Sequence, residues 1–274
     1  RAARTLYASD EDYARLGERV QAQFVAHGAF DGDVCFMRKD GSPVWARVQG
    51  RGVRAHDMAG GTVWILEDLT AAREAQQQQD WAAIHDPLTQ LCNREAFVHR
   101  MGVLLAERSA RARTPGVEAV DAAEGEGDGV MLFLDLDHFT VVNDLAGHDA
   151  GDDVLRHVAR LLESHVRQIG WAARLGGDEF AVVLPGCSLA RGQALAEQLR
   201  AAVQAWEPSY QGRSFTLGVS IGLVVLDASL QDVPSVLYAA DMACYDAKRA
   251  GRNRVETRHA DQAAASGRMA LGPV

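Results

Sequence analysis

The sequence predicts an α+β fold for its second half, joined through one helix to a smaller domain that contains a sheet. From Asp86 onward, strand-like and helix-like apolar patterns interleave along the chain. Gly176 and Gly177 separate two short apolar runs, which is typical of a hairpin. The chain has 274 residues, of which 47% are hydrophobic, and this is enough for two domains with cores of their own.

Residues 1–70 are expected to form the smaller domain. A helix-like stretch, DYARLGERVQAQFVAHG, precedes three strand-like runs, DVCFMRK, PVWARVQGRGV and GTVWILEDL. Asp40 and Gly41 provide the turn residues of a tight hairpin between the first two runs. The phrases FMRKDGSPVWARVQG and GGTVWILEDLT resemble the C-terminal part of a PAS sensor domain whose first two strands and most helices are missing. An unrelated small antiparallel sheet is the alternative.

Residues 71–85 are expected to form a signalling or linker helix between the domains. The stretch LTAAREAQQQQDWAAIHD contains good helix formers and has no Gly or Pro before Pro87. Its apolar stripe is thin and is diluted by glutamines, so either a parallel coiled coil or a solvated helix fits the pattern. The stripe consists of Leu69, Ala72, Trp81 and Ile84.

Residues 86–257 carry the elements of the larger domain. VMLFLDL is a buried strand by length and content, WAARL and DEFAVVL are the arms of the Gly-Gly hairpin, and FTLGVSIGLVVL is a further strand. Helices are predicted for REAFVHRMGVLLAER, for Asp152 to Val166, for LARGQALAEQLRAAVQAW and for PSVLYAADMACYDAKRA, which ends at Gly251. The stretch RARTPGVEAVDAAEGEGDG lacks an apolar rhythm and is predicted to be a mobile loop. This order indicates an antiparallel sheet covered by helices on one face, of the ferredoxin-like or polymerase-palm type.

Charge and cysteine usage exclude several classes of protein. With a formal net charge of -9 and a pI near 5.5, the average field repels nucleic acid and anionic membrane, so neither is expected as a partner. The four cysteines form no CxxC or Cys/His pattern, which argues against a disulfide framework or structural zinc and suits the cytoplasm. No apolar run reaches the ~18 residues of a membrane span. Both ends look like cuts through a longer protein, so an anchor could lie outside this sequence, and residues 258–274 are expected to be disordered or to link to a missing domain.

Carboxylates are predicted to gather at one edge of the larger sheet. Asp135 ends a buried strand, and Asp178 and Glu179 begin the second arm of the hairpin, so pairing of these strands would bring the acids together. Hard oxygen ligands suit Mg²⁺, which takes one or two protein carboxylates and completes its shell with phosphate and water. The adjoining glycines leave no side chains above the turn, so a nucleotide could lie against the backbone. Solvated strand-end acids are the alternative.

Four blocks of this half resemble the GGDEF family of diguanylate cyclases: DPLTQLCNREAF, DLDHFTVVNDLAGHDAGDDVL, RLGGDEFAVVLPG and ADMACYDAKRAGRNRV. The resemblance covers about residues 86–257 and implies a sheet like those of adenylyl cyclases and polymerase palms. It implies that two GTP molecules become cyclic di-GMP and two pyrophosphates, with Mg²⁺ or Mn²⁺ as cofactor. One domain would hold one GTP, so the two-fold symmetry of the product implies a homodimer.

The resemblance also implies roles for the acids. Asp135, the backbone carbonyl of Leu136 and Asp178 match metal-holding positions of the family. Asp178 further matches the proposed acceptor of the ribose 3′-hydroxyl proton. Glu179 is expected to assist in positioning metal or phosphate, so Asp178 and Glu179 are the expected catalytic residues.

Substrate contacts follow from the same resemblance. Asn143 and Asp152 match the guanine-reading pair, although both flank helix starts and could instead be helix caps. His148 matches a further substrate-side position, and the backbone around Phe139 could form an anion-binding nest.

Two basic residues match the cations of the family that bind triphosphate. Lys248 and Arg252 are expected one helical turn apart near a helix end, where they could reach the same phosphate oxygens. Compensation of the helix dipole is the alternative.

Several positions depart from the pattern of the family. Thr140 replaces a Lys that usually lies beside the triphosphate, which predicts slow turnover. Gln90 replaces a Gly and Cys244 a Leu, and both are expected to be packing changes. In RQIGWAARLGGDEF, Arg167 keeps the cation of the usual product-inhibition motif while Gly170 replaces its Asp, which predicts a degenerate inhibitory site. A shifted site built by Arg167 and another acid is the alternative.

The substitution at Thr140 leaves a second function open. In that interpretation the domain binds GTP without turning it over and regulates another domain, of the phosphodiesterase type, that is absent from this sequence. A purely structural dimerisation module is a third interpretation, but it leaves the retained acids unexplained.

Overall fold

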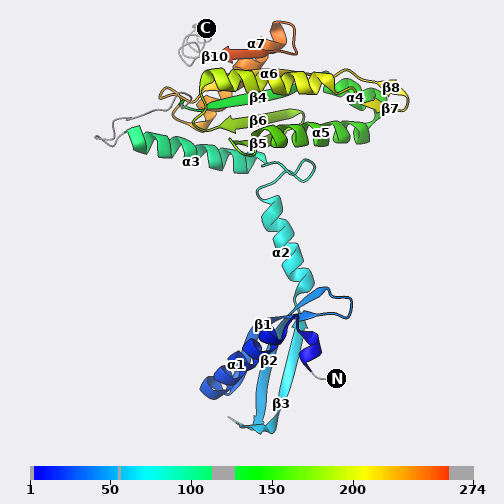
Figure 1. Cartoon of the computed structure of the whole chain (residues 1–274), viewed down its shortest axis with the longest axis vertical. Coiled ribbons are helices and arrows are strands. Elements are labelled where there is room, and N and C mark those ends of the chain that lie inside the picture. Colours follow the sequence, from blue (N-terminus) through cyan, green and yellow to red (C-terminus); the bar gives the residue numbers. More distant parts are fainter. Residues whose placement is uncertain (1–2, 55–56, 113–126, 259–274) are drawn as a thin grey trace, which may run out of the picture. The chain divides into compact units, whose positions relative to one another are not determined.

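The computed structural model describes residues 3–54, 57–112 and 127–258. The chain divides into two compact units, Arg1–Trp81 and Ala82–Val274, whose elements are labelled in Figure 1. Parts of two predicted segments lie outside the described residues: 113–126 of the loop and 259–274 of the tail. None of the helices in the described ranges is long and apolar enough to span a membrane.

The first unit contains the predicted helix and the three predicted strands. After the short 3-10 helix η1 (Ala3–Leu6) come α1 (Asp10–His27), β1 (Ala29–Met37), β2 (Pro43–Arg54) and β3 (Asp57–Asp68). The strands form an antiparallel sheet in the order β1-β2-β3. The predicted hairpin turn is present, since the amide of Gly41 donates to the carbonyl of Arg38 at 3.0 Å.

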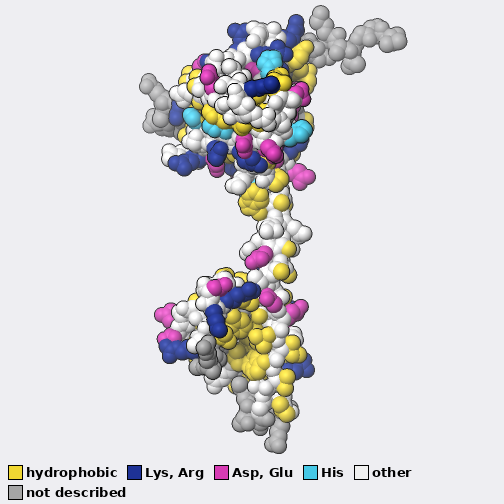
Figure 2. All heavy atoms as spheres, turned by 90° about the vertical axis from the view of Figure 1, so that its right-hand side faces the viewer, with side chains coloured by type: hydrophobic (Ala, Val, Ile, Leu, Met, Phe, Trp, Pro, Cys, Tyr) yellow, Lys and Arg dark blue, Asp and Glu magenta, His cyan; other side chains and the backbone are white. Residues whose placement is uncertain are grey.

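One face of this sheet has a small core beneath α1. The core consists of Phe24, Phe30, Val34, Ala46 and Val48. β3 lies at an edge of the sheet and exposes Val63, Ile65 and Leu66. Figure 2 shows hydrophobic side chains gathered on this unit.

The predicted linker helix is α2 (Thr70–Ala82), which buries none of its side chains. It ends at Ala82, three residues before the predicted end at residue 85. The side-chain amide of Asn93 donates to the carbonyls of Ala82 (3.2 Å) and Ala83 (3.0 Å), and its backbone amide donates to the carbonyl of Ile84 (3.0 Å). These bonds satisfy the carbonyls at the helix end and turn the chain, which explains the earlier stop.

The second unit is built on a five-stranded sheet in the order β10-β9-β4-β6-β5. Its strands are β4 (Val130–Asp137), β5 (Trp171–Gly176), β6 (Glu179–Leu184), β9 (Gly218–Val225) and β10 (Val255–Arg258), and β7 (Ser209–Tyr210) and β8 (Arg213–Ser214) form a separate hairpin. β4 is antiparallel to β6, as predicted, and it is also antiparallel to β9. β10, which the sequence did not reveal as a strand, is parallel to β9, so the sheet is mixed rather than wholly antiparallel.

Helices cover both faces of this sheet, and the prediction of one covered face was wrong. The helices are α3 (Arg94–Ala112), α4 (Phe139–Ala146), α5 (His148–Val166), α6 (Leu189–Ala205) and α7 (Val233–Arg249), and Figure 1 shows them around the strands. On β4, Leu132 and Leu134 join the core with α5 and α6, whereas Met131 and Phe133 join the core with α3 and α7. A strand buried on both faces has a continuous apolar run, which is the pattern of VMLFLDL.

Candidate active site

The predicted acids meet where β4 ends beside the β5–β6 hairpin. Asp135 of β4 lies directly opposite Glu179 of β6 in the antiparallel register. Asp178 precedes Glu179 in the turn, and its carbonyl accepts from the amide of Leu136 at 3.4 Å. The three acids therefore share one end of the sheet, as the sequence predicts.

The Gly-Gly turn leaves open space beside these acids. Gly176 and Gly177 have φ values of +153° and +49°, and a Cβ built on either would meet no atom within 4 Å. Positive φ at Gly177 favours glycine, and the absence of side chains exposes the backbone of the turn. A flat ligand can thus approach the main chain here.

The carboxylates of the site repel one another. Burial raises the pKa of Asp135, the charges of Asp178 and Asp137 add to this, and the ion pair with Lys248 (2.5 Å) opposes it. Burial also raises the pKa of Glu179, helped by Asp135, Asp241 and Asp178 and opposed by Arg94. In both cases the negative form is disfavoured, so additional positive charge would be stabilised at this end of the sheet.

The donor set fits a hard divalent cation that brings most of its own ligands. Within the described ranges, no three His, Cys, Asp or Glu side chains are arranged to hold a metal ion by themselves. Mg²⁺ needs only one or two protein carboxylates when phosphate and water complete its shell. Asp135 and Glu179, paired across two strands with raised pKa values, can supply that number, and Asp178 is adjacent.

The hairpin is held in place by a charged clamp that the sequence did not reveal. The guanidinium of Arg174 donates to the carbonyl of Gly177 through Nε (3.0 Å) and Nη2 (2.8 Å). Its Nη1 donates to both carboxylate oxygens of Asp86, at 3.1 and 3.3 Å. Asp86 also accepts from the amide (2.8 Å) and hydroxyl (2.7 Å) of Thr89. The DPLT segment is therefore connected to the turn that carries Asp178.

The predicted guanine readers lie on two adjoining helices. A Cβ on Gly151 of α5 would overlap the side-chain oxygen of Asn143 on α4, so the side chain of Asn143 lies against the backbone next to Asp152. Asn143 is inside α4, and Asp152 is inside α5 and forms an ion pair with Arg156 at 3.6 Å. The N-caps of α4 and α5 are His138 and Gly147, so the interpretation of Asn143 and Asp152 as helix caps was wrong.

Two other predicted substrate positions lie at helix starts. His148 is the first residue of α5 and is exposed. Phe139 is the first residue of α4, is half-buried and packs against the core. It follows His138, whose left-handed φ of 60° turns the chain from β4 into α4. The first residues of α4 thus follow the acids of β4 after a single intervening residue.

The two predicted cations approach the end of β4 from α7 and from the turn that follows it. Lys248 lies in the last turn of α7 and pairs with Asp135. Arg252 does not lie one turn further along the helix as predicted, because α7 ends at Arg249 and Arg252 follows in a turn with φ of 64°. Its Nε is 4.0 Å from Asp137. Each cation therefore has an acid of β4 near it.

Asp137 was missed as a functional candidate. It is 4% exposed and lies two residues after Asp135, so the two-residue period of the strand places both on the same face. The signal in the sequence was the second acid of DLD, at the end of an otherwise apolar run.

The departures from the expected pattern have separate physical causes. Cys244 is a packing change, as predicted: it is 2% exposed, its thiol donates to the carbonyl of Ser220 at 3.2 Å, and burial raises its pKa to about 12. Gln90 is not a packing change, because it is exposed and has a φ of 64° that favours glycine. Gly170 has no room for a side chain, since a Cβ would overlap the carbonyl of Val183. Thr140 is exposed on α4, near the acids in sequence.

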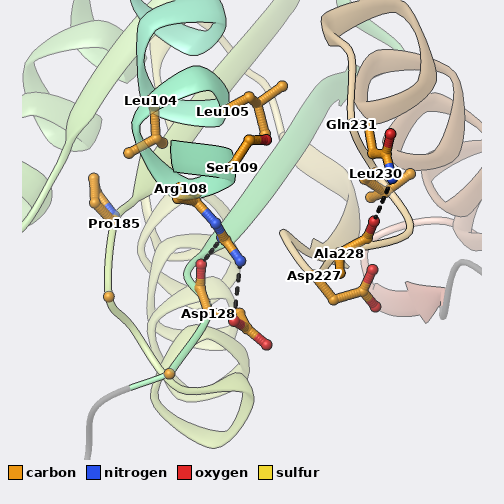
Figure 3. Close-up of a pocket in the computed structure, with 12 residues that line it drawn as sticks. Leu104, Leu105, Arg108, Ser109, Asp128, Pro185, Asp227, Ala228, Leu230 and Gln231 are labelled. Carbon is orange, nitrogen blue, oxygen red and sulfur yellow. Dashed lines mark hydrogen bonds and ion pairs between the residues drawn. The ribbon is translucent and has the colours of Figure 1, made fainter. Parts of the chain in front are cut away.

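A pocket of about 690 Å³ lies at the opposite end of β4 and does not contain the predicted site residues. Figure 3 shows Arg108 of α3 reaching Asp128, just before β4, with Leu104 and Pro185 nearby. The acids lie at the other end of the same strand. The candidate site is therefore identified by its clustered acids and its open backbone, and not by the volume of this pocket.

Comparison with known proteins shows the family of the second unit. The family model described as "Diguanylate cyclase, GGDEF domain" matches residues 83–254. "Probable diguanylate cyclase DgcE" of Escherichia coli is 36% identical over 205 residues, which are 75% of this chain and 17% of that protein. Diguanylate cyclase DgcP of Pseudomonas aeruginosa is 38% identical over 190 residues, which are 69% of this chain and 26% of that protein. The chain thus spans about a quarter, or less, of the length of these two relatives.

Solved structures share the fold. The coiled coil and GGDEF domain of DgcB from Caulobacter crescentus, solved in complex with c-di-GMP, aligns with a TM-score of 0.59 at 29% identity, covering 69% of this chain and 93% of that chain. The family model covers more than half of the present chain and contains the acids, the Gly-Gly turn and the helices that surround them. This chain therefore belongs to the GGDEF family of diguanylate cyclase domains.

Proposed function

We propose that the second unit joins two GTP molecules into cyclic di-GMP and releases two pyrophosphates. The observation that carries the proposal is the meeting of Asp135, Asp178 and Glu179 beside an open Gly-Gly turn, within a domain of this family. The relative DgcP is named a diguanylate cyclase, and the structural neighbour DgcB was solved with c-di-GMP.

The reaction consists of two phosphoryl transfers. In each, the 3′ oxygen of one GTP bonds to the α-phosphorus of the other, and the bond from that phosphorus to pyrophosphate breaks. The proton of the 3′-hydroxyl passes to Asp178, which is half-buried in the turn. Mg²⁺ or Mn²⁺, held by Asp135, the Leu136 carbonyl, Asp178 and Glu179, would stabilise charge on the attacking and leaving oxygens.

The remaining predicted residues orient the nucleotide. Asn143 and Asp152 recognise the guanine edge, because an amide and a carboxylate together accept and donate hydrogen bonds. His148 and the backbone at Phe139 contact the substrate near the helix starts. Lys248 and Arg252 bind the triphosphate, where a charge-assisted bond to an anion is stronger than a neutral one.

The active species is a cytoplasmic homodimer. One domain provides one set of base-reading residues and therefore holds one GTP, and the product contains two equivalent halves. The first unit acts as a PAS-type sensor, a proposal supported by its antiparallel sheet and by α2, which leads from it toward the catalytic domain.

The activity is tested by incubating the chain with GTP and Mg²⁺ and separating the nucleotides by chromatography. Cyclic di-GMP and pyrophosphate should appear in a ratio of one to two. Asp178→Asn should lower the rate roughly 10²- to 10⁴-fold, because the proton acceptor is lost. The matched control is Asp227→Asn, at the opposite end of the sheet, which should keep the wild-type rate. Equal rates in the two variants would refute the assignment.

Base recognition is tested by competition between GTP and ATP. Asn143→Ala should reduce the preference for GTP about tenfold, since a hydrogen bond to the base edge is lost. The control is Asp144→Ala, the exposed next residue of α4, which should keep the preference. A preference that survives Asn143→Ala would place guanine elsewhere.

Thr140 favours a second function, in which the domain binds GTP without turnover and regulates a phosphodiesterase-type domain. An exposed Thr at the second position of α4 provides no cation for the triphosphate. Calorimetric binding of GTP with no cyclic product at high protein concentration would establish this alternative. Product formation would exclude it.

Control by the first unit can be tested at Arg73 of α2. Its guanidinium bonds Asp33 of β1 at 2.6 Å and stacks on the ring of Trp45 at 4.1 Å, so it connects α2 to the sheet of the first unit. Arg73→Ala should change the rate of GTP turnover although it lies outside the second unit. The control is the exposed Arg15→Ala, whose Asp12 contact is 3.8 Å long. Identical rates would argue against regulation through α2.

A further inference from the structure

Asp137 has an unusually complete set of contacts for an acid at the end of a strand. It is the last residue of β4 and is 4% exposed. One carboxylate oxygen accepts from the hydroxyl of the fully buried Ser220 at 2.8 Å. The other accepts from the backbone amide of Asn253 at 2.9 Å. Because a buried carboxylate is strongly disfavoured unless it is hydrogen-bonded, these contacts stabilise Asp137 in its buried position.

The partner segment is the turn that follows α7. Arg252 and Asn253 both have left-handed φ values, 64° and 45°; Asn tolerates this conformation, but it is unfavourable for Arg252. Such a turn persists only when its surroundings hold it. Asp137 bonds its backbone from β4, and Arg200 of α6 bonds the side-chain oxygen of Asn253 at 3.1 Å.

The guanidinium of Arg252 is left available by this arrangement. Its Nε is 4.0 Å from Asp137, beyond hydrogen-bond distance, and the side chain is half exposed. Lys248 meanwhile contacts Asp135, two residues before Asp137 on the same face of β4. The end of β4 therefore positions Lys248 through its ion pair with Asp135. It positions Arg252 through the hydrogen bond that the backbone amide of the next residue, Asn253, donates to Asp137.

We propose that Asp137 is a positioning residue that holds Arg252 where the triphosphate of GTP binds. The inference rests on the proposed function. Asp137 does not touch the nucleotide: its two oxygens bind Ser220 and the Asn253 amide, which keeps the strained turn in place and points the guanidinium of Arg252 toward the anion. Loss of this carboxylate lets the turn relax to ordinary backbone angles and moves Arg252 away.

The test compares the affinities of GTP and GMP, measured by calorimetric titration of the full chain with Mg²⁺. GMP retains the base and ribose contacts but lacks the β- and γ-phosphates. Asp137→Asn should weaken GTP binding about tenfold and leave GMP binding within about twofold. Arg252→Ala should do the same, and the double variant should be no weaker than Arg252→Ala alone, because the two residues act as one unit. Asp227→Asn, whose carboxylate caps a turn with Ser229, is the matched control.

The outcomes separate this inference from the proposed function. Equal losses of GTP and GMP affinity, or additive losses in the double variant, would overturn the positioning role. If Asp137→Asn does not fold, Ser220→Ala is the second variant, because it keeps the carboxylate and removes only one of its hydrogen bonds. It should weaken GTP binding less than Asp137→Asn would and leave GMP binding unchanged. An unchanged GTP-to-GMP ratio in that variant would overturn the inference. Failure of the wild-type chain to bind GTP would overturn the proposed function, and the inference with it.

Discussion

Replacing Arg174 should destabilise the second unit and slow its reaction together. Arg174→Ala removes the hydrogen bonds to the Gly177 carbonyl and the ion pair with Asp86. The side chain of Arg174 is 14% exposed and that of Asp86 is 19% exposed. Breaking a fully buried ion pair by removing one partner reduces stability by about 3 to 5 kcal/mol. Because both partners retain some contact with water, about 2 to 3 kcal/mol is expected here.

The rate should fall as well, because the lost bonds hold the turn that carries Asp178. A displacement of the reacting groups by about 1 Å can lower a rate on the order of 10²-fold. Urea unfolding followed by circular dichroism measures the stability, and the initial rate of cyclic di-GMP formation measures the activity. The control is Arg108→Ala, whose partner Asp128 is 61% exposed, so its loss should be below about 1 kcal/mol.

The loss in Arg174→Ala should also depend on pH. Burial raises the pKa of Asp86, but hydrogen bonds from Thr89 and the charge and bonds of Arg174 outweigh it and lower the pKa below its ordinary value. A lowered pKa contributes stability above the unfolded value, about 3.9, and that stability is lost as the pH falls through the folded value. The difference between wild type and variant should therefore be full at neutral pH and shrink below about pH 4. A difference that is constant with pH, or equal midpoints for Arg174→Ala and Arg108→Ala, would refute the clamp.

Three other substitutions follow from the departures from the family pattern. Thr140→Lys should raise the initial rate by about 10²-fold through a charge-assisted contact to phosphate, and an unchanged rate would show that this position does not face the triphosphate. Gln90→Gly should stabilise the chain by up to about 1 kcal/mol in urea unfolding. The free energy gained by removing the strain of a left-handed φ of 64° exceeds the cost of the extra chain entropy of glycine in the unfolded state. A lower unfolding midpoint would contradict this. Gly170→Asp should lower stability by about 1 to 3 kcal/mol because a Cβ overlaps the Val183 carbonyl. It should not create a product-binding site with Arg167, so tight calorimetric binding of several cyclic di-GMP molecules to this variant would be the contrary result.

The elements with strong local signals could be predicted from the sequence. A continuous apolar run identified β4, two glycines between short apolar runs identified the β5–β6 hairpin, and acids at the ends of these strands indicated where they meet. Each of these depends on residues close together in the chain. The meeting of Asp135 with Asp178 and Glu179 could be predicted because antiparallel neighbours place strand ends side by side, whereas the register that sets Asp135 opposite Glu179 is seen only in the structure.

Features that depend on distant residues could not be predicted in the same way. β10 has only four residues, and its pairing with β9 is not visible in its composition. The helices on the second face of the sheet pack against Met131 and Phe133 of β4. The apolar run of β4 does not indicate which helices cover these residues. The Asp86–Arg174 clamp joins residues 88 positions apart, and the left-handed turn at Arg252 is held by contacts from β4 and α6.

The alternation of side chains along β4 relates these parts to the proposed chemistry. Leu134 and Leu136 point into the core beneath α5, whereas Asp135 and Asp137 share the opposite face, near Lys248 of α7 and Arg252 of the turn after it. The proposed base readers on α4 and α5 and the proposed phosphate-binding cations, at the end of α7 and in the turn after it, are thus on different sides of the same strand end. A nucleotide that contacts both proposed sets must cross that end, so we expect its α-phosphate beside Asp135 and the turn of Asp178. A slip of one residue in the pairing of β4 would exchange its two faces, turning Asp135 and Asp137 toward α5 and α6 and the leucines toward α7, so the register that forms the core is also the register that forms the site.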